Sequence, residues 1–237
     1  MSEKGLAIGE AGFLVTDDRE IYERAVAFGH YERTGWISCQ MRHRIESPEL
    51  LELARVPLGG YKYRMHQLSS AVGRSQLKHY PERMAEIQRA MNHFWDLLDG
   101  VPGVVAHRPP QDSGSTMGGW YAAKGLYAPE ELGGLPVARF CEAVTAECGQ
   151  FKIMPGANPL MHLHPVLNDA DVYGHGKPTR IANSDRDLRQ PAGSLPVTEG
   201  LPGRIYSIPW FKHFDAEIIG QYATAFRKVA EHAEELQ

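Results

Sequence analysis

Hydrophobic positions near the start of the chain predict a short buried strand followed by a helix. Residues 12–16 form a continuous apolar run, which is typical of a strand in the middle of a sheet with neighbours on both sides. The Asp-Asp pair at 17–18 can cap a helix, and Gly29 can end it. The apolar positions on one face of this helix, which we expect to point inward, are Ile21, Ala25 and Phe28.

A helical period dominates the middle of the chain and is interrupted by one proline. Residues 30–58 keep no sustained period, so we expect an irregular connection there. From His66 the helical period runs on to Gly100, where the segment ends. Because Pro81 lacks a backbone N–H, we expect a kink or a break near Tyr80. The apolar stripe of this helix comprises Leu68, Ala71, Val72, Met84, Ile87, Met91 and Leu98.

The second half of the chain predicts a compact α+β domain. Strand patterns occupy 104–105, 119–127, 151–154 and 205–208. Pro136 opens a helix that Gly149 ends, and Asp215 caps the last helix. The inward positions of these two helices are Phe140, Val144, Ile219, Tyr222, Phe226, Val229 and Ala233. Residues 155–203 are rich in Pro, Gly, Asn and Asp, and we expect them to be mostly loop.

Composition and charge exclude several classes of partner. The 237 residues are 43% hydrophobic and 23% charged, which is close to the globular average and sufficient for a sizeable core. A formal net charge of −4 lacks the concentrated positive footprint that a nucleic-acid partner requires. No apolar run approaches the roughly 18 residues of a membrane helix, and no leader segment opens the chain. We therefore expect a soluble cytoplasmic protein without nucleic-acid or membrane partners.

The three cysteines, Cys39, Cys141 and Cys148, have no Cys-x-x-Cys spacing and cannot all pair with one another. This pattern indicates reduced, intracellular thiols. Cys141 and Cys148 would share one face of a helix, which favours packing in the core. No activating base is near them in the sequence, so a nucleophilic cysteine is not expected.

Candidate chemistry begins at Lys4. A lysine near the start of a chain is by itself a solvated charge more often than a nucleophile. Here a short apolar spacer follows it, then the turn Gly-Glu-Ala-Gly at 9–12, and then the apolar strand that ends at Thr16. This context, rather than the lysine alone, makes Lys4 a candidate.

Three sequence blocks in this order resemble the DegT/DnrJ/StrS family of sugar aminotransferases. The first is the lysine segment at 4–16, in which Ala11 replaces a glycine of the family's turn. The second is Leu-Gly-Gly-Tyr-Lys-Tyr-Arg-Met-His-Gln-Leu at 58–68, continuing to a Gln-Leu pair at 76–77. The third is Arg-Ile-Tyr-Ser-Ile-Pro-Trp-Phe at 204–211, followed by the capped helix. Together the blocks cover essentially the whole chain.

The resemblance implies an α/β fold, the C-terminal part of a fold-type-I transferase that depends on pyridoxal 5′-phosphate. Residues 1–100 would hold the remnant of the large cofactor-binding domain and a long inter-domain helix, and residues 101–237 a small α+β domain. The implied activity is transfer of an amino group, from a donor such as glutamate, to a keto-sugar carried on a nucleotide, as in aminosugar or polysaccharide biosynthesis. The family also implies a homodimer with shared sites.

The resemblance assigns roles to individual residues as well. Lys4 would be the catalytic residue, whose amine forms an imine with pyridoxal phosphate and then carries a proton between substrate and cofactor. Lys62 stands where the family has an asparagine that reaches the phosphate of the partner's cofactor, and a positive charge suits that phosphate. The alternative is a solvated lysine. His30, Tyr31 and His162 are candidate substrate contacts, although a histidine at a helix end also interacts with the helix dipole.

Three histidines, His162, His164 and His175, also raise a metal hypothesis. A His-x-His pair can offer two imidazole ligands to zinc. No acidic or cysteine residue is spaced with them convincingly, and the prolines around them indicate a loop. We therefore expect no metal site here.

The position of Lys4 raises the expectation that the chain is truncated. The family's phosphate-binding turn, the aromatic side chain on the cofactor ring and the carboxylate at the ring nitrogen all precede the lysine. Only Met1, Ser2 and Glu3 do so here, and a central strand at 12–16 would lack its neighbours. We expect a C-terminal portion that does not hold the cofactor productively alone. The alternative is a catalytically inactive remnant, or a dimerisation module.

Overall fold

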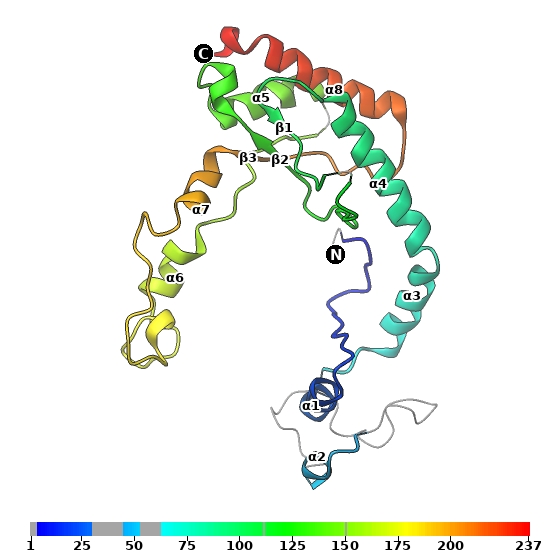
Figure 1. The fold of residues 1–237 in the computed structure, drawn as a ribbon, viewed down its shortest axis with the longest axis vertical. Helices are drawn as coiled ribbons and strands as arrows, with labels where there is room; N and C mark the ends of the chain where they lie inside the picture. The colour runs from blue at the N-terminus through cyan, green and yellow to red at the C-terminus, as the bar shows by residue number, and fades with distance from the viewer. Residues whose placement is uncertain (1–3, 30–44, 53–62, 111, 150) are drawn as a thin grey trace. The chain divides into compact units, whose positions relative to one another are not determined.

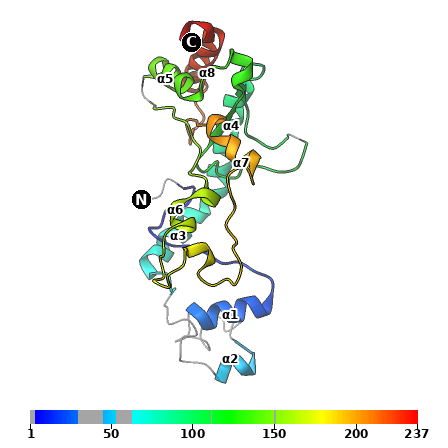
Figure 2. The same cartoon turned by 90° about the vertical axis from the view of Figure 1, so that its left-hand side faces the viewer.

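The computed structural model describes residues 4–29, 45–52, 63–110, 112–149 and 151–237. Its helices and strands are drawn from two sides in Figures 1 and 2. The chain divides into two compact units, unit 1 (Met1–Pro81) and unit 2 (Glu82–Gln237). The boundary between the two units falls inside the predicted long helix, whereas the boundary between the two predicted domains falls after residue 100. The helices before this boundary are α1 (Arg19–Gly29), α2 (Pro48–Glu52) and α3 (Gln67–Lys78), and α4 (Tyr80–Leu97) spans it.

Helix α1 begins at the predicted cap but buries a different face. The Asp18 carboxylate accepts hydrogen bonds from the backbone N–H groups of Glu20 and Ile21, at 2.8 and 3.1 Å. The prediction that Ile21, Ala25 and Phe28 point inward is wrong, because all three are exposed. The face that meets α2 is buried instead, and its residues are Glu23, Val26, Ala27 and Gly29. Helix α2 itself lies in a segment predicted to be irregular.

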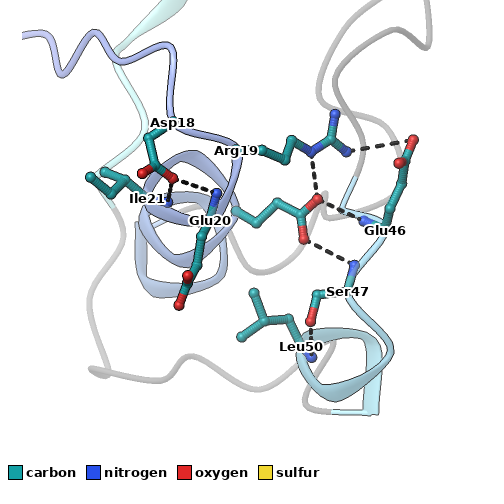
Figure 3. Close-up of polar contacts among 8 residues, drawn as sticks. Asp18, Arg19, Glu20, Ile21, Glu46, Ser47 and Leu50 are labelled. Atoms are coloured by element: carbon teal, nitrogen blue, oxygen red, sulfur yellow. Dashed lines mark hydrogen bonds and ion pairs between the residues drawn. The ribbon is translucent and has the colours of Figure 1, made fainter.

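A buried carboxylate joins α2 to α1. Glu23 is 4% exposed, and its two oxygens accept the backbone N–H groups of Glu46 at 3.1 Å and Ser47 at 2.9 Å. The Arg19 guanidinium pairs with the same carboxylate at 2.5 Å. Figure 3 shows the residues around it, with the Ser47 hydroxyl receiving the Leu50 N–H at the start of α2. Every oxygen of this buried charge is therefore paired, which its burial requires.

The apolar run at 12–16 is not a strand, which contradicts the prediction. In the part of the chain that the structure describes, these residues join no sheet. Phe13, Leu14 and Val15 are 65, 67 and 91% exposed. A strand forms only where a neighbour receives its N–H and C=O groups, and the described residues supply none at this point.

The predicted break in the long helix is confirmed and lies at His79. The His79 N–H donates to the Gln76 carbonyl at 3.1 Å, closing α3, and α4 begins at the next residue. Pro81 sits in the first turn of α4, where its missing N–H costs no helical hydrogen bond. At the other end of α3, the His66 ring Nδ1 accepts the Leu68 N–H at 3.2 Å and caps the helix.

Unit 2 is built on a small antiparallel sheet. Among the described residues the strand order is β1 (Val104–Val105), β2 (Lys124–Tyr127) and β3 (Ile205–Ser207). The predicted strand at 119–127 is too long, because Trp120 and Ala122 have φ of 52° and 51°, which no strand permits. The predicted strand at 151–154 is wrong, although a single bridge joins Pro155 to Tyr206 just after it.

Helix α5 (Val137–Cys148) and helix α8 (Ala216–Glu231) pack side by side on this sheet (Figures 1 and 2). The Asp215 carboxylate accepts two backbone N–H groups, confirming the predicted cap of α8. Apart from the partly buried Tyr222, the inward positions predicted on both helices are buried, so their helical period predicted the core correctly. Aromatic side chains fill its centre: Phe94, Tyr127, Phe140, Tyr206 and Phe226.

The remaining elements of unit 2 are short. They are η2 (Pro129–Leu132), η3 (Met161–Leu163), α6 (Pro165–Asn168), η4 (Thr179–Ile181), α7 (Pro196–Gly200), η5 (Leu201–Gly203) and η6 (Ala233–Leu236). The stretch 155–203 is therefore mostly loop with brief helical turns, as predicted. Among the described helices, none combines the length and the apolar character needed to cross a membrane.

Candidate functional site

Lys4 is exposed and precedes a half-buried segment, residues 5–8, whose backbone is held by α3. The Gln76 side chain makes two hydrogen bonds to Ala7: its amide oxygen accepts the Ala7 N–H at 3.0 Å, and its NH₂ group donates to the Ala7 carbonyl at 2.6 Å. At the next position Ile8 packs against Gly73, where a Cβ would meet Ile8 Cγ2 at 3.4 Å. The Lys4 side chain is exposed. The structure thus presents a primary amine next to an anchored stretch of backbone.

Three other predicted site residues, His30, Tyr31 and Lys62, lie outside the described residues. Their predicted roles in binding substrate or cofactor phosphate stay predictions.

His162 is buried and joined to a carboxylate that the sequence analysis did not connect with it. Its side chain is 4% exposed, and its Nε2 lies 3.0 Å from Glu199 Oε1. The Glu199 carboxylate also accepts the N–H groups of Gly193 at 2.7 Å and Leu195 at 3.0 Å. These two backbone donors, and then His162, hold the pKa of Glu199 below its ordinary value. His162 therefore helps to tie loop 193–195 to η3, and its predicted contact with substrate stays a prediction.

The other two histidines of the metal hypothesis make local contacts. The His164 ring Nδ1 accepts the Val166 N–H at 3.2 Å, which caps α6. His175 stacks on Tyr173 with ring centroids 5.9 Å apart. Within the described ranges, no three His, Cys, Asp or Glu side chains gather closely enough to hold a metal ion.

A pocket of about 550 Å³ lies beside His162 and is lined by two cations. Lys124 reaches the Ser207 hydroxyl at 3.1 Å, and Arg180 donates to a backbone carbonyl and a side-chain amide oxygen. Within the part of the chain that the structure describes, neither cation has a carboxylate partner. The rest of the lining is largely apolar, from Pro159, Leu160, Met161, Leu195, Leu201, Pro202 and Ile205. Such a pocket suits a ligand that combines negative charge with an apolar surface.

The two described cysteines are core residues, as predicted. Cys141 is buried and Cys148 packs at the edge of the same core; neither forms a disulfide. Burial raises the pKa of the Cys141 thiol to about 12 and that of Cys148 to about 11. Neither thiol is an activated nucleophile, and Cys39 lies outside the described residues.

The sequence analysis missed four residues of these two regions. Gln76 was part of a recognised block, yet nothing in the local pattern indicated a contact with Ala7. The sequence held no signal for Glu199, Lys124 or Arg180 either. Glu199 and Arg180 meet their partners through the path of the loop between 155 and 203, whereas Lys124 meets Ser207 across the β2–β3 pair. Contacts of this kind depend on tertiary structure rather than on helical or strand period.

Comparison with known proteins gives one family match. The model of the DegT/DnrJ/EryC1/StrS aminotransferase family matches residues 1–175. Among curated proteins, the L-glutamine:scyllo-inosose aminotransferase of Streptomyces griseus is 28% identical over 240 residues. That alignment includes 98% of this chain and 52% of the relative, so the chain spans about half the length of the curated relative it matches.

Solved structures show the same fold at lower identity. An E. coli GDP-4-keto-6-deoxy-D-mannose-3-dehydratase with bound hydrated PLP is 18% identical, with a TM-score of 0.57 over 90% of this chain and 49% of that one. The S. venezuelae DesV in complex with a ketimine intermediate is 20% identical, with a TM-score of 0.51 over 79% of this chain and 46% of that one. These likenesses agree with the predicted fold class, an α/β chain of fold type I, and include only a portion of each neighbour.

Proposed function

The chain belongs to the DegT/DnrJ/EryC1/StrS aminotransferase family, and from this premise we propose that it contributes the catalytic lysine of a pyridoxal-phosphate-dependent sugar aminotransferase. The observation that carries the proposal is that Lys4 is an exposed residue and stands three residues before Ala7, whose backbone Gln76 fixes. Pyridoxal phosphate requires a primary amine from its protein, and Lys4 carries one.

Lys4 has two tasks in this proposal. Its Nζ would be the nucleophile that bonds the cofactor aldehyde. The same Nζ would hold a proton and pass it on during the transfer. Bound pyridoxal phosphate supplies the electron sink for the transfer. Lys62, which the resemblance assigns to the phosphate, completes the cofactor contacts proposed for this chain.

For the acceptor we propose a keto-sugar linked to a nucleotide, with an amino donor such as glutamate. The pocket beside His162 supports this choice, because the cations Lys124 and Arg180, which have no carboxylate partner among the described residues, would match a diphosphate. Its apolar walls would meet a sugar or base. His30 and Tyr31 stay as further proposed substrate contacts.

A second acceptor class is favoured by the Streptomyces relative, whose name specifies L-glutamine and scyllo-inosose. A cyclitol ketone of that kind carries no phosphate. It would leave the two cations of the pocket without a counter-charge, so the nucleotide-linked sugar is our first choice.

We also propose a homodimer in the cytoplasm. Exposed apolar side chains of unit 1 support association with a second copy: Phe13, Leu14 and Val15, and on α3 Leu68 and Val72. The two free thiols of unit 2 favour a reducing compartment. The alternative of a dimerisation module without catalysis rests on the same exposed surface.

An amino-transfer assay tests the proposed activity. The chain is incubated with pyridoxal phosphate and ¹⁵N-labelled glutamate or glutamine, with a nucleotide-linked keto-sugar or scyllo-inosose as acceptor. If this chain holds the cofactor productively, contrary to the expectation from the sequence alone, ¹⁵N appears in the nucleotide-linked product, and none appears when Lys4→Arg replaces the wild type. Transfer to scyllo-inosose alone would select the second acceptor class. Absence of transfer to either acceptor would favour the module without catalysis.

A further inference from the structure

The Gln76 side chain bonds both backbone polar groups of one residue, Ala7, across a sequence separation of 69 residues. We propose that Gln76 is a positioning residue that sets the backbone from which Lys4 reaches the cofactor. The inference rests on the proposed role of Lys4. In this proposal a residue of α3 positions a lysine that lies in a different segment of unit 1.

The chemistry of the contact is specific to a carboxamide. Asn and Gln are the neutral side chains that present one acceptor and one NH₂ donor on the same planar group. The Gln76 amide therefore imitates a peptide group and gives Ala7 the pair of bonds that a neighbouring strand would give. A carboxylate could accept the Ala7 N–H but could not donate to its carbonyl. An apolar side chain could do neither.

The contact also lies where it can affect Lys4. Each residue of chain spans at most roughly 3.6 Å, so fixing Ala7 confines the Lys4 backbone to a short radius. Ile8 adds an apolar anchor on the same helix through Gly73. Both anchors come from α3, and the His66 cap fixes the start of that helix. The segment that carries the amine is thereby ordered before any ligand binds, which reduces the entropy lost on binding.

A purely structural role for Gln76 predicts something different. In that case its loss would loosen the contact with Ala7 and leave the selectivity of Lys4 for the cofactor unchanged. The two roles are separated by measuring two quantities in the same variant: the hydrogen exchange of the Ala7 amide and the labelling of Lys4 by the cofactor.

The test compares Gln76→Met, which keeps the length of the side chain and removes both bonds, with Gln67→Met at an exposed position of the same helix. Each 237-residue chain is treated with pyridoxal phosphate and then borohydride, and the labelled fraction of each lysine is measured by peptide mass spectrometry. The exposed Lys152 of unit 2 is the internal reference. Hydrogen exchange at the Ala7 amide, followed by NMR, reports the backbone contact.

We expect wild type and Gln67→Met to label Lys4 well above Lys152. In Gln76→Met the Lys4 label should fall about tenfold, as expected for two lost hydrogen bonds. The Lys152 label should stay constant, and the Ala7 amide should lose protection. If Gln76→Met does not fold, Gln76→Glu keeps the acceptor for the Ala7 N–H and should lower the Lys4 label about threefold.

Two results would overturn the inference, and they differ. Lost protection at Ala7 with unchanged labelling of Lys4 would reduce Gln76 to a structural residue and leave the proposed function intact. Equal labelling of Lys4 and Lys152 in the wild type would instead remove the proposed role of Lys4, and the positioning role with it.

Discussion

Single side chains join segments that are distant in sequence in both units. Gln76 bonds Ala7, Glu23 bonds the backbone ahead of α2, and Glu199 bonds loop 193–195 and His162. Each holds a stretch without regular structure whose backbone groups would otherwise need water. The functional proposals depend on two of these contacts, because Gln76 orders the Lys4 segment and Glu199 orders one wall of the cationic pocket.

The Glu23 carboxylate makes a pH-dependent contribution to stability. Burial raises its pKa, but the hydrogen bonds from Arg19 and from the Ser47 and Glu46 N–H groups outweigh burial and leave the pKa below its ordinary value. A depressed pKa means that the stabilisation is complete above the unfolded-state pKa of about 4.3 and is lost as the pH falls through the folded-state value.

We therefore expect Glu23→Gln to destabilise the contact between α1 and α2 by about 1–3 kcal/mol at pH 7, with the difference from wild type shrinking below about pH 4. Urea unfolding followed by circular dichroism at pH 7 and pH 3.5 measures this. The exposed Glu20→Gln, on the same helix, is the matched control. A Glu23→Gln deficit that is equally large at both pH values would contradict the assignment.

At the scale of elements, the β2–β3 pair depends on one glycine. A Cβ at Gly125 would lie 2.4 Å from the Tyr206 ring, which is itself fully buried among aromatic side chains. The strand register pairs these two residues directly. No flexible end of a side chain is available to move aside, since Tyr206 contacts Phe140 and Phe226.

Gly125→Ala should accordingly cost about 1–3 kcal/mol of unfolding free energy through overpacking. Gly220→Ala in α8 meets nothing within 4 Å and should be neutral or stabilise by up to about 1 kcal/mol, because alanine favours helix. Chemical denaturation of the two variants beside wild type measures both effects. Equal stabilities for Gly125→Ala and Gly220→Ala would show that the sheet adapts at this point.

Elements that depend on a local sequence pattern could be predicted from the sequence. Elements that depend on contact with a distant segment of the chain could not. The Asp18 and Asp215 caps, the break at His79 and the stripe of α8 follow from hydrogen bonding and period within one segment. The run at 12–16 has the composition of a strand but no described neighbour. Helix α2 was missed because it is short and is held by Glu23, whose contacts no period reveals.

The same division applies to the candidate site. Lys4 and Lys62 were found through sequence blocks that a family resemblance made meaningful. Gln76 stood in one of those blocks without a role, because its contact with Ala7 exists only once α3 and the lysine segment meet. The cations Lys124 and Arg180 lie far apart in the sequence and share a pocket through the path of the intervening loop.

For the molecule as a whole, the family membership rests on the match over residues 1–175, and the proposed chemistry depends on the lysine segment. The chain spans about half the length of the relatives that it matches, so the activity of the whole protein is a proposal. What the described structure offers is an exposed lysine on an anchored segment in unit 1 and a pocket lined by two cations in unit 2. The central claim is that Lys4 is the residue that bonds the cofactor.

The most direct test is to locate the covalent bond. The chain is mixed with an equimolar amount of pyridoxal phosphate, reduced with borohydride and digested, and the labelled peptides are identified by mass spectrometry. The account predicts that the label lies predominantly on Lys4 and disappears from that peptide in Lys4→Arg, with Lys152 and Lys177 labelled only weakly. Label spread evenly over the exposed lysines, and unchanged in total by Lys4→Arg, would contradict it.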